Sequence, residues 1–175
     1  MNNANFPEIR SKRLLLRQLQ PTDWETISFL RSDKKVNEFV IRPGAKLKKE
    51  ALAFISKINK GIIDKTLYYW VITEKTNPKM IGSICLWNFS EDKKVAEVGY
   101  DLHPEHQGKG VMTESLKSVV RFGFNTLHLE HIEAFTHQLN ESSTRLLEKN
   151  GFSLVPGKKD EHNLNNIVYD IKKSP

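Results

Sequence analysis

The sequence predicts a mixed α/β (α+β) fold, in which a central, mostly antiparallel sheet is covered by helices. Some segments have apolar residues at alternate positions, as strands do, and others have them at three- and four-residue spacing, as helices do. The order of these segments is βααβββαβαββ, and short turns join the three consecutive strands in its middle. The 175 residues, 38% of them hydrophobic, suit a single domain over 1–175 with a sizeable core.

The N-terminal part of the chain predicts one strand and two helices. Residues 8–19 are rich in leucine and indicate a strand. Thr22 and Glu25 have the spacing of a capping box, so we expect a helix over 23–32. A second helix should end at Gly61. Its apolar stripe consists of Leu47, Ala51, Phe54, Ile55 and Ile58.

The middle of the chain predicts an antiparallel meander of three strands. The strands are expected over 67–73, 80–89 and 95–102, with turns at 77–79 and 90–93. Alternate residues of a strand point to opposite faces. In the third strand, one face should carry Ala96, Val98, Tyr100 and Leu102, and the other Glu97, Gly99 and Asp101.

The C-terminal part predicts helices alternating with strands. An apolar stripe from Met112 to Leu127 indicates a helix, and residues 130–136 indicate a strand. Asn140 is a favourable N-cap for a further helix, for which Gly151 provides the C-terminal cap. The last two strands are expected over 152–155 and 167–171.

The composition excludes several classes of protein. The net charge of +6 could attract nucleic acid, an acidic membrane or a polyanionic small molecule, but the lysines are scattered and lack interleaved aromatic residues. The single cysteine, Cys85, lies in an apolar run and allows no internal disulfide. No segment has the character of a signal peptide or a membrane span, and the histidines have no metal-ligand spacing. We therefore expect a cytoplasmic protein without a metal, a membrane partner or a nucleic-acid partner.

The stretch HPEHQGKGVMTESL, residues 103–116, places Gly108 and Gly110 directly before a helix. The first N–H groups of a helix lack partners inside it, and its dipole adds positive charge there, so residues 107–113 predict a phosphate site. A P-loop would need Lys-Ser/Thr after its last glycine, and here valine and methionine follow. A dinucleotide fingerprint would need a third glycine. A plain tight turn is the remaining alternative.

The segment Gln107–Met112 resembles the Gln/Arg-x-x-Gly-x-Gly/Ala motif of the GNAT superfamily of N-acetyltransferases. The similarity covers roughly residues 8–172 and is strongest to the RimJ/RimL branch. The other segments that match this branch are 13–17, 22–23, 97–104, 112–114, Asn140-x-x-Ser143 and 146–152.

The resemblance implies a sheet that splays after the third meander strand, with acetyl-CoA as co-substrate in the gap. The pyrophosphate would bind backbone N–H groups, and the pantetheine arm would pair with the free strand edge and with the side chain of Asn140. The expected acetyl-CoA-binding residues are Tyr100, Leu102, Gln107, Gly108, Lys109, Gly110, Val111, Met112, Thr113, Asn140 and Ser143.

The resemblance also implies that a primary amine attacks the thioester directly, so a base must first remove a proton from the amine. Glu97 is the first candidate and Asp101 the second, and a solvated strand residue is the alternative for Glu97. Ser143 is the candidate donor of a hydrogen bond or proton to the departing thiolate, with an ordinary helix serine as its alternative. Two positions depart from the family pattern: Met112 replaces a small residue, and Leu147 replaces a tyrosine proposed as that donor.

The acceptor expected from the RimJ/RimL branch is the α-amine of a peptide or protein, as in ribosomal-protein acetylation, or else a small amine. Residues 24–65 and 156–166 should shape its site, and they carry the least pattern. The competing hypothesis is an inactive CoA-sensing or RNA-binding module on the same fold, which the leucine at position 147 favours. A homodimer is common in this branch.

Overall fold

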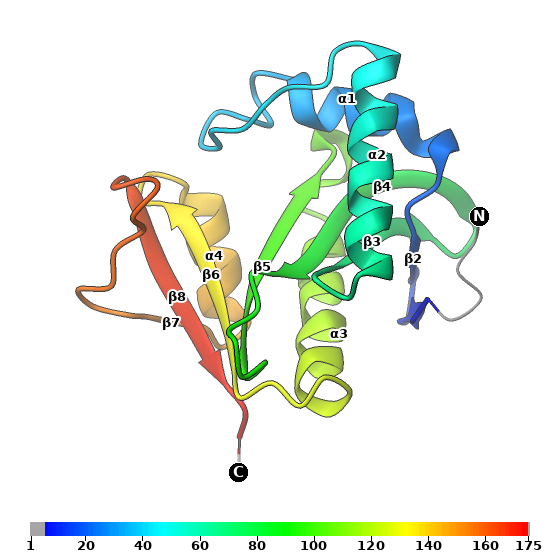
Figure 1. Ribbon diagram of the computed structural model, residues 1–175. Coiled ribbons are helices and arrows are strands. Elements are labelled where there is room, and N and C mark those ends of the chain that lie inside the picture. The colour runs from blue at the N-terminus through cyan, green and yellow to red at the C-terminus, as the bar shows by residue number, and fades with distance from the viewer. Residues whose placement is uncertain (1–5, 175) are drawn as a thin grey trace.

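The computed structural model describes residues 6–174, which form one sheet with helices on both faces (Figure 1). The strands are β1 (Ile9–Arg10), β2 (Leu14–Gln18), β3 (Tyr68–Glu74), β4 (Asn77–Trp87), β5 (Val95–Leu102), β6 (His131–His137), β7 (Ser153–Leu154) and β8 (Asn166–Lys172). The helices are α1 (Trp24–Ser32), α2 (Lys48–Ile63), α3 (Val111–Asn125) and α4 (Glu141–Lys149), with single 3-10 turns η1 (Pro21–Asp23) and η2 (Pro104–His106).

The order of strands across the sheet is β1-β2-β3-β4-β5-β6-β8-β7. Every neighbouring pair is antiparallel except β5 and β6, which are parallel. The predicted α/β class and the antiparallel meander of β3, β4 and β5 are therefore confirmed. Within residues 6–174, we find no helix with the length and apolar character needed to cross a bilayer.

The prediction of one strand over residues 8–19 is wrong. The segment forms two short antiparallel strands, with Ile9 opposite Leu16. The turn between them is fixed from outside, because Glu114 on α3 accepts hydrogen bonds from the Ser11 hydroxyl and the Arg13 backbone N–H, both at 2.7 Å. A contact with a residue a hundred positions away leaves no local signal.

The predicted start of the first helix is correct within a residue, but its cap differs. The sequence had suggested a capping box of Thr22 and Glu25, but the N-cap of α1 is Asp23, which makes no side-chain capping hydrogen bond. The capping box lies at η1, where the carboxylate of Asp23 accepts from the backbone N–H of Gln20 at 2.9 Å. The Arg17 guanidinium holds that carboxylate at 2.7 and 2.8 Å. This ion pair between β2 and η1 orients the helix entry.

The predicted end of the second helix and the predicted turn at 77–79 are also wrong. Gly61 does not end α2, because the helix continues for two residues. A Cβ at Gly61 would lie 2.8 Å from the side chain of Leu67, so the glycine permits close packing. Residues 77–79 lie inside β4, since Glu74 pairs with Asn77 and leaves a two-residue turn between them.

Two apolar clusters cover the two faces of the sheet. We call the face covered by α1 and α2 the front, and the face covered by α3 and α4 the back (Figure 1). The predicted alternation along β5 is confirmed, because Ala96 and Val98 are buried in the back cluster. The front cluster contains Leu19, Ile27, Leu30, Ala45, Ala51, Ile55, Ile62, Tyr69, Val71 and Met80.

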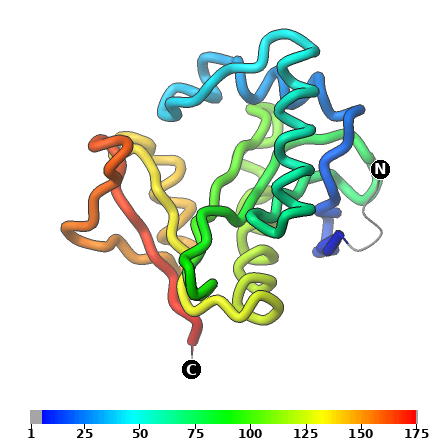
Figure 2. The backbone as a smooth tube through the Cα atoms, in the orientation of Figure 1, coloured from blue at the N-terminus to red at the C-terminus, as the bar shows by residue number. Residues whose placement is uncertain are grey.

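The sheet splays between β5 and β6. The two strands pair only over residues 95–97, opposite residues 131–133. Beyond this point residues 98–102 pair with β4 alone, and residues 134–137 pair with β8 alone. The strands diverge as a V that is visible in both backbone views (Figures 1 and 2). The predicted splay is confirmed.

Candidate active site

The V-shaped opening has a front and a back wall made by alternate residues of the same strands. On the front, β5 presents Glu97, Gly99 and Asp101. Because Glu97 pairs with Glu133, the residues of β6 on this face are Glu133, Phe135 and His137. On the back, β5 presents Tyr100 toward α4. Carboxylates thus gather on one wall and hydroxyl groups on the other.

A hydrogen bond crosses the opening on its back wall. The Tyr100 hydroxyl lies 2.7 Å from the Ser143 hydroxyl in the first turn of α4. The backbone N–H of Ser143 donates to the side-chain oxygen of Asn140 at 3.2 Å, which confirms Asn140 as the N-cap. Burial raises the pKa of Tyr100 to about 12, although the Ser143 hydrogen bond opposes this. Tyr100 therefore keeps its proton at neutral pH.

Leu147 has no access to the chemistry of the opening. It is completely buried in the back cluster, one turn after Ser143. A leucine has no proton to donate, whereas Tyr100 places a phenol directly against Ser143. A hydroxyl pair contributed by β5 and α4 is thus present although the expected tyrosine on α4 is missing.

Glu97 lies at the closed end of the V, on its front wall. Burial raises the pKa of its carboxyl to about 7. A hydrogen bond from the Asn88 amide, at 3.5 Å, lowers the pKa, while the charges of Asp160 and Glu133 raise it. A carboxylate with a pKa near the operating pH is suited to accept a proton.

Asp101, the second candidate base, is bound to an arginine that the sequence did not single out. Arg42, from the loop 33–47 between α1 and α2, donates to both carboxylate oxygens at 2.7 and 3.1 Å. Its guanidinium also binds the Asn37 side chain and the Leu30 carbonyl. Asp101 thereby anchors this loop to β5. Within residues 6–174, Glu97 is the front-wall carboxylate of β5 that forms no ion pair with a cationic side chain.

The two glycines adopt the conformation that the sequence predicts for a tight turn. Gly108 and Gly110 have φ of +72° and +75°, in the left-handed region that favours glycine. Gly110 is the N-cap of α3, so the backbone N–H groups of its first turn point into the turn. Met112 is buried in the core, and its bulk therefore points away from this end of the helix. The Gln107 side chain donates to the Leu102 carbonyl at 3.2 Å and ties the turn to β5.

An arginine–glutamate pair holds the same turn from the other side. The Arg13 guanidinium donates to the Lys109 carbonyl at 3.1 Å and to Glu114 at 2.8 Å. Burial would raise the pKa of Glu114, but hydrogen bonds from the Arg13 backbone, the Ser11 hydroxyl and the Arg13 side chain lower it to about 2. Both residues belong to the segments that carry the family resemblance, and their pairing is visible only in the structure.

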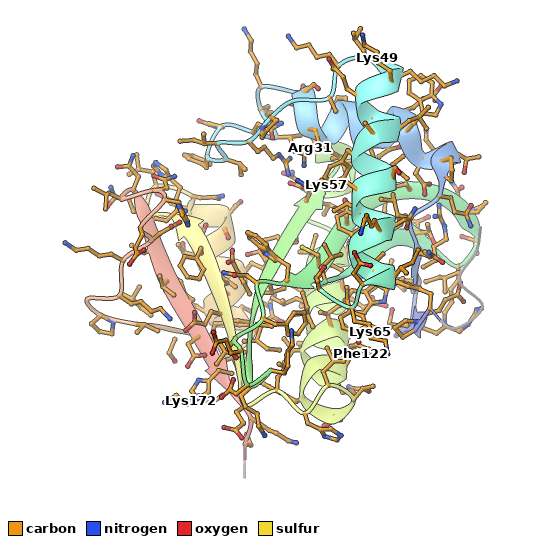
Figure 3. All side chains as sticks on the ribbon, viewed as in Figure 1. Arg31, Lys49, Lys57, Lys65, Phe122 and Lys172 are labelled. Atoms are coloured by element: carbon orange, nitrogen blue, oxygen red, sulfur yellow. The ribbon has the colours of Figure 1, made fainter. Side chains whose placement is uncertain are left out.

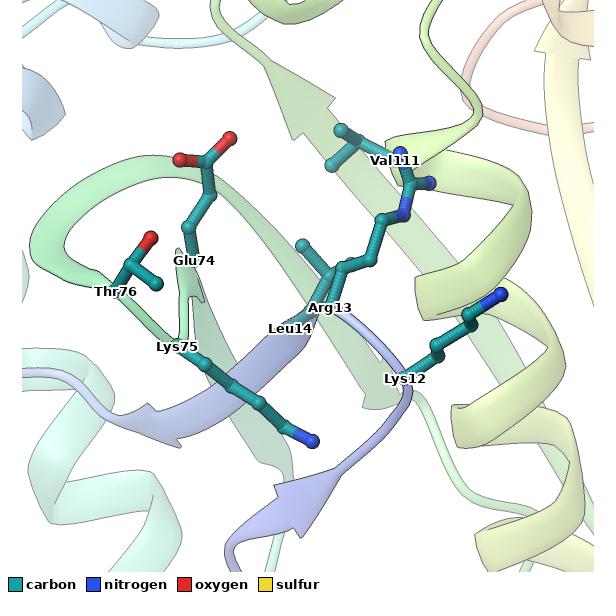
Figure 4. A pocket seen from close by; sticks show the side chains of 7 residues that line it. All are labelled: Lys12, Arg13, Leu14, Glu74, Lys75, Thr76 and Val111. Atoms are coloured by element: carbon teal, nitrogen blue, oxygen red, sulfur yellow. The ribbon is translucent and has the colours of Figure 1, made fainter.

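A surface hollow of about 400 Å³ lies beside the first residue of α3 (Figure 4). Its charged side chains are Lys12, Arg13, Lys75 and Glu74, from the β1–β2 and β3–β4 turns. The hollow is separate from the V, but it adds net positive charge near the N-terminus of α3.

Other residues that the sequence singled out have structural surroundings. The His137 ring lies 5.3 Å from the Phe39 ring, measured between centroids. Cys85 packs against the front cluster, and burial raises the pKa of its thiol to about 12. Lysines such as Lys49 and Lys57 lie on the exposed surface of α2 (Figure 3). Among residues 6–174, no three His, Cys, Asp or Glu side chains form a group that could hold a metal ion.

Comparison with known proteins assigns the chain to a family. The family model for the acetyltransferase (GNAT) domain matches residues 13–153. The chain belongs to the GNAT acetyltransferases. The uncharacterized N-acetyltransferase YoaA of Bacillus subtilis is 31% identical over 147 residues, which are 84% of this chain and 83% of the relative. The protein is thus an acyl-CoA-dependent N-acetyltransferase.

Solved structures show the same GNAT fold. The ribosomal-protein-S5-alanine acetyltransferase from Vibrio fischeri superposes with a TM-score of 0.81 at 20% identity, covering 95% of this chain and 96% of its own. Mycobacterium smegmatis RimJ, in complex with CoA-disulfide, also gives a TM-score of 0.81, at 16% identity, covering 98% of this chain and 90% of its own. At these identities the superpositions show that the chain shares its fold with these RimJ-type and ribosomal-protein acetyltransferase structures.

Proposed function

We propose that this GNAT protein transfers the acetyl group of acetyl-CoA to the α-amine of a polypeptide by direct attack. The observation that carries the proposal is the V between β5 and β6, which has a helix N-terminus at its edge and different chemistry on its two walls. The ribosomal-protein acetyltransferases among its structural neighbours support a polypeptide acceptor, and the CoA-bound RimJ structure supports the donor.

The donor would occupy the α3 end and the free edge of β5. Backbone N–H groups over residues 107–113 would bind the pyrophosphate, because they lie at the positive end of the dipole of α3. The unpaired edge over residues 98–102 offers backbone groups at Tyr100 and Leu102 to the amide-rich pantetheine arm. The Leu102 carbonyl already accepts from Gln107 and has a second lone pair to offer. Asn140 uses its oxygen as the cap and keeps its amide nitrogen as a donor.

Glu97 would take the proton from the acceptor ammonium, so that the amine nitrogen can attack the thioester carbonyl carbon. Glu97 lies on the front wall at the closed end of the V, and the bound donor would leave this side of the opening free for the acceptor. The raised pKa means that the carboxylate holds the proton more tightly than an exposed glutamate would. Asp101 is bound by Arg42 and would position the loop 33–47.

Ser143 would donate a hydrogen bond to the sulfur as the C–S bond breaks, and the thiolate would leave without taking the serine proton. The thiolate needs modest help, because a free thiol has a pKa of about 8.5. The two hydroxyl oxygens lie 2.7 Å apart. With Tyr100 as the donor in this hydrogen bond, the serine proton would be free to point toward the opening. Tyr100 is a positioning residue in this scheme, and it supplies the hydroxyl that Leu147 lacks.

The experiment that tests the proposal measures release of free CoA thiol with purified protein, acetyl-CoA and three acceptor panels: N-terminal peptides, polyamines and amino-sugars. We expect turnover with peptides and mass-spectrometric acetylation at their α-amine. Ser143→Ala should lower kcat by about tenfold to a hundredfold. Ser142→Ala, at the exposed neighbouring position of α4, is the matched control and should keep wild-type kcat. CoA binding without thiol release across all panels would contradict the proposal and favour a sensor.

A further inference from the structure

Three of the most exposed large apolar side chains of the described chain lie in three different loops. Ile41, in loop 33–47, is 87% exposed; Leu164, in the loop between β7 and β8, is 79% exposed; and Leu139, between β6 and α4, is 67% exposed. Single exposed apolar residues are ordinary on protein surfaces. The three side chains can form one binding surface only if the three loops lie side by side.

Contacts between these segments bring the three loops together at the open end of the V. The Phe39 ring of loop 33–47 lies against the His137 ring at the end of β6. The backbone N–H of Gln138 donates to the Asn165 carbonyl at 2.9 Å. Ile41 follows Phe39 by two residues, Leu139 follows Gln138, and Leu164 precedes Asn165. We call Ile41, Leu139 and Leu164 the apolar rim. The backbone views show loop 33–47 and the β6–α4 connection at the open end of the V, where the β7–β8 loop also ends (Figures 1 and 2).

Below the apolar rim, the front wall is acidic. Glu97 and Glu133 face each other across the last paired position of β5 and β6, and the charge of Asp160 also acts on Glu97. Lys158 forms an ion pair with Glu133, and the Asn166 amide donates to Asp160 at 2.8 Å. Three carboxylates against one lysine leave a net attraction for a cationic amine. We call Glu97, Glu133 and Asp160 the acidic floor.

We propose that the apolar rim binds apolar side chains near the N-terminus of a polypeptide acceptor, while its α-amine reaches the acidic floor. This inference rests on the proposed function and names the substrate class more closely. An α-ammonium followed by apolar side chains matches both surfaces at once. A polyamine would match the floor but has no apolar side chain to cover the rim.

The spacing of the two surfaces sets which acceptor residues reach the rim. Four residue steps separate Glu133 from His137 along β6, or about 13 Å at about 3.3 Å per residue. An extended peptide advances by about the same distance per residue. With the first residue at the floor, the fifth residue of the acceptor therefore lies level with His137, and the third to fifth residues cover the approach to the rim.

The test uses the full-length protein, acetyl-CoA and two amidated hexapeptides without lysine. Both begin with Ser-Gly and end with Asp, and positions three to five are all leucine in one and all serine in the other. For wild type, we expect kcat/KM for the leucine peptide to be about tenfold higher, mainly through KM. Ile41→Ser and Leu164→Ser should each reduce that preference by about fivefold. The serine peptide should react equally with wild type and both variants.

The matched control is Ile63→Ser, because Ile63 is also 67% exposed but lies in the last turn of α2, outside the rim. It should retain the wild-type preference. Three results would each refute the proposed role of the rim. They are equal kcat/KM for the two peptides, a loss of the leucine preference in Ile63→Ser as large as in the rim variants, and turnover of spermidine alone. Absence of turnover with every amine would refute the proposed acetyltransferase reaction itself, so the two failures are distinguishable.

Discussion

The role of Glu97 gives the sharpest prediction, because its environment sets the pH at which the enzyme should work. A carboxyl with a pKa of about 7 is roughly one-tenth ionised at pH 6 and about nine-tenths ionised at pH 8. Only the ionised form can accept a proton from the ammonium. At saturating acetyl-CoA and peptide, kcat should therefore rise about tenfold between pH 6 and pH 8.

Glu97→Gln keeps the size of the side chain and removes its basicity. General-base catalysis contributes about 10²- to 10⁴-fold, so kcat should fall by that factor, equivalent to about 3–5 kcal/mol of activation free energy. The KM for acetyl-CoA should stay within about twofold, because the donor site lies at α3 and the edge of β5. The rising limb near pH 7 should disappear from the kcat profile.

The assay is thiol release from pH 5.5 to 9, with single-turnover measurements to isolate the chemical step. Glu133→Gln is the matched control, because it removes a neighbouring charge that raises the pKa of Glu97. That variant should remain active, and its rising limb should move to lower pH. If Glu97→Gln retained both the limb and a kcat within about threefold of wild type, the ionisation would belong to the acceptor amine and the assignment would be refuted.

Three further predictions concern the other parts of the site. Tyr100→Phe should lower kcat for acetyl-CoA about threefold to tenfold, and less for an acetyl thioester of a more acidic thiol, because Ser143 loses its orienting donor; equal losses with both donors would contradict this. Gly110→Ala should weaken acetyl-CoA binding in calorimetry, since φ of +75° costs an alanine about 1 kcal/mol; unchanged affinity would count against the turn. Glu114→Gln should reduce the free energy of unfolding in urea by about 2 kcal/mol at pH 7. Because the pKa of Glu114 is lowered from 4.5 to about 2, its contribution is present above pH 4.5 and is lost as the pH falls toward 2, so wild type and variant should converge there.

Much of the binding end of the site was predictable because its signals are local. Gly108 and Gly110 stand directly before a helical stripe, and their positive φ values are a property of the turn itself. Asn140 caps α4 through a hydrogen bond to a residue three positions on. Such short-range patterns can be recognised in a single sequence.

The parts that were missed depend on contacts between distant segments. Arg42 binds Asp101 across 59 positions, and nothing in the pattern of loop 33–47 distinguishes that arginine from the others. Glu114 reshapes the N-terminal strand from 101 positions away. Gly61 was misinterpreted for a nearer reason, because the side chain of Leu67, six positions further on, packs against it.

The sequence by itself determined the order of elements after the N-terminal strand segment, the alternation along β5 and the glycine turn before α3, because periodicity and glycine conformation are properties of neighbouring residues. Only the tertiary structure decided the chemistry of the V. The parting of β5 from β6 after Glu97 brings Tyr100 to Ser143 and leaves Glu97 among other carboxylates. The pKa of a carboxyl and the partner of a hydroxyl depend on what the fold places beside them, and those neighbours come from the β4–β5 turn, β6, α4 and the β7–β8 loop.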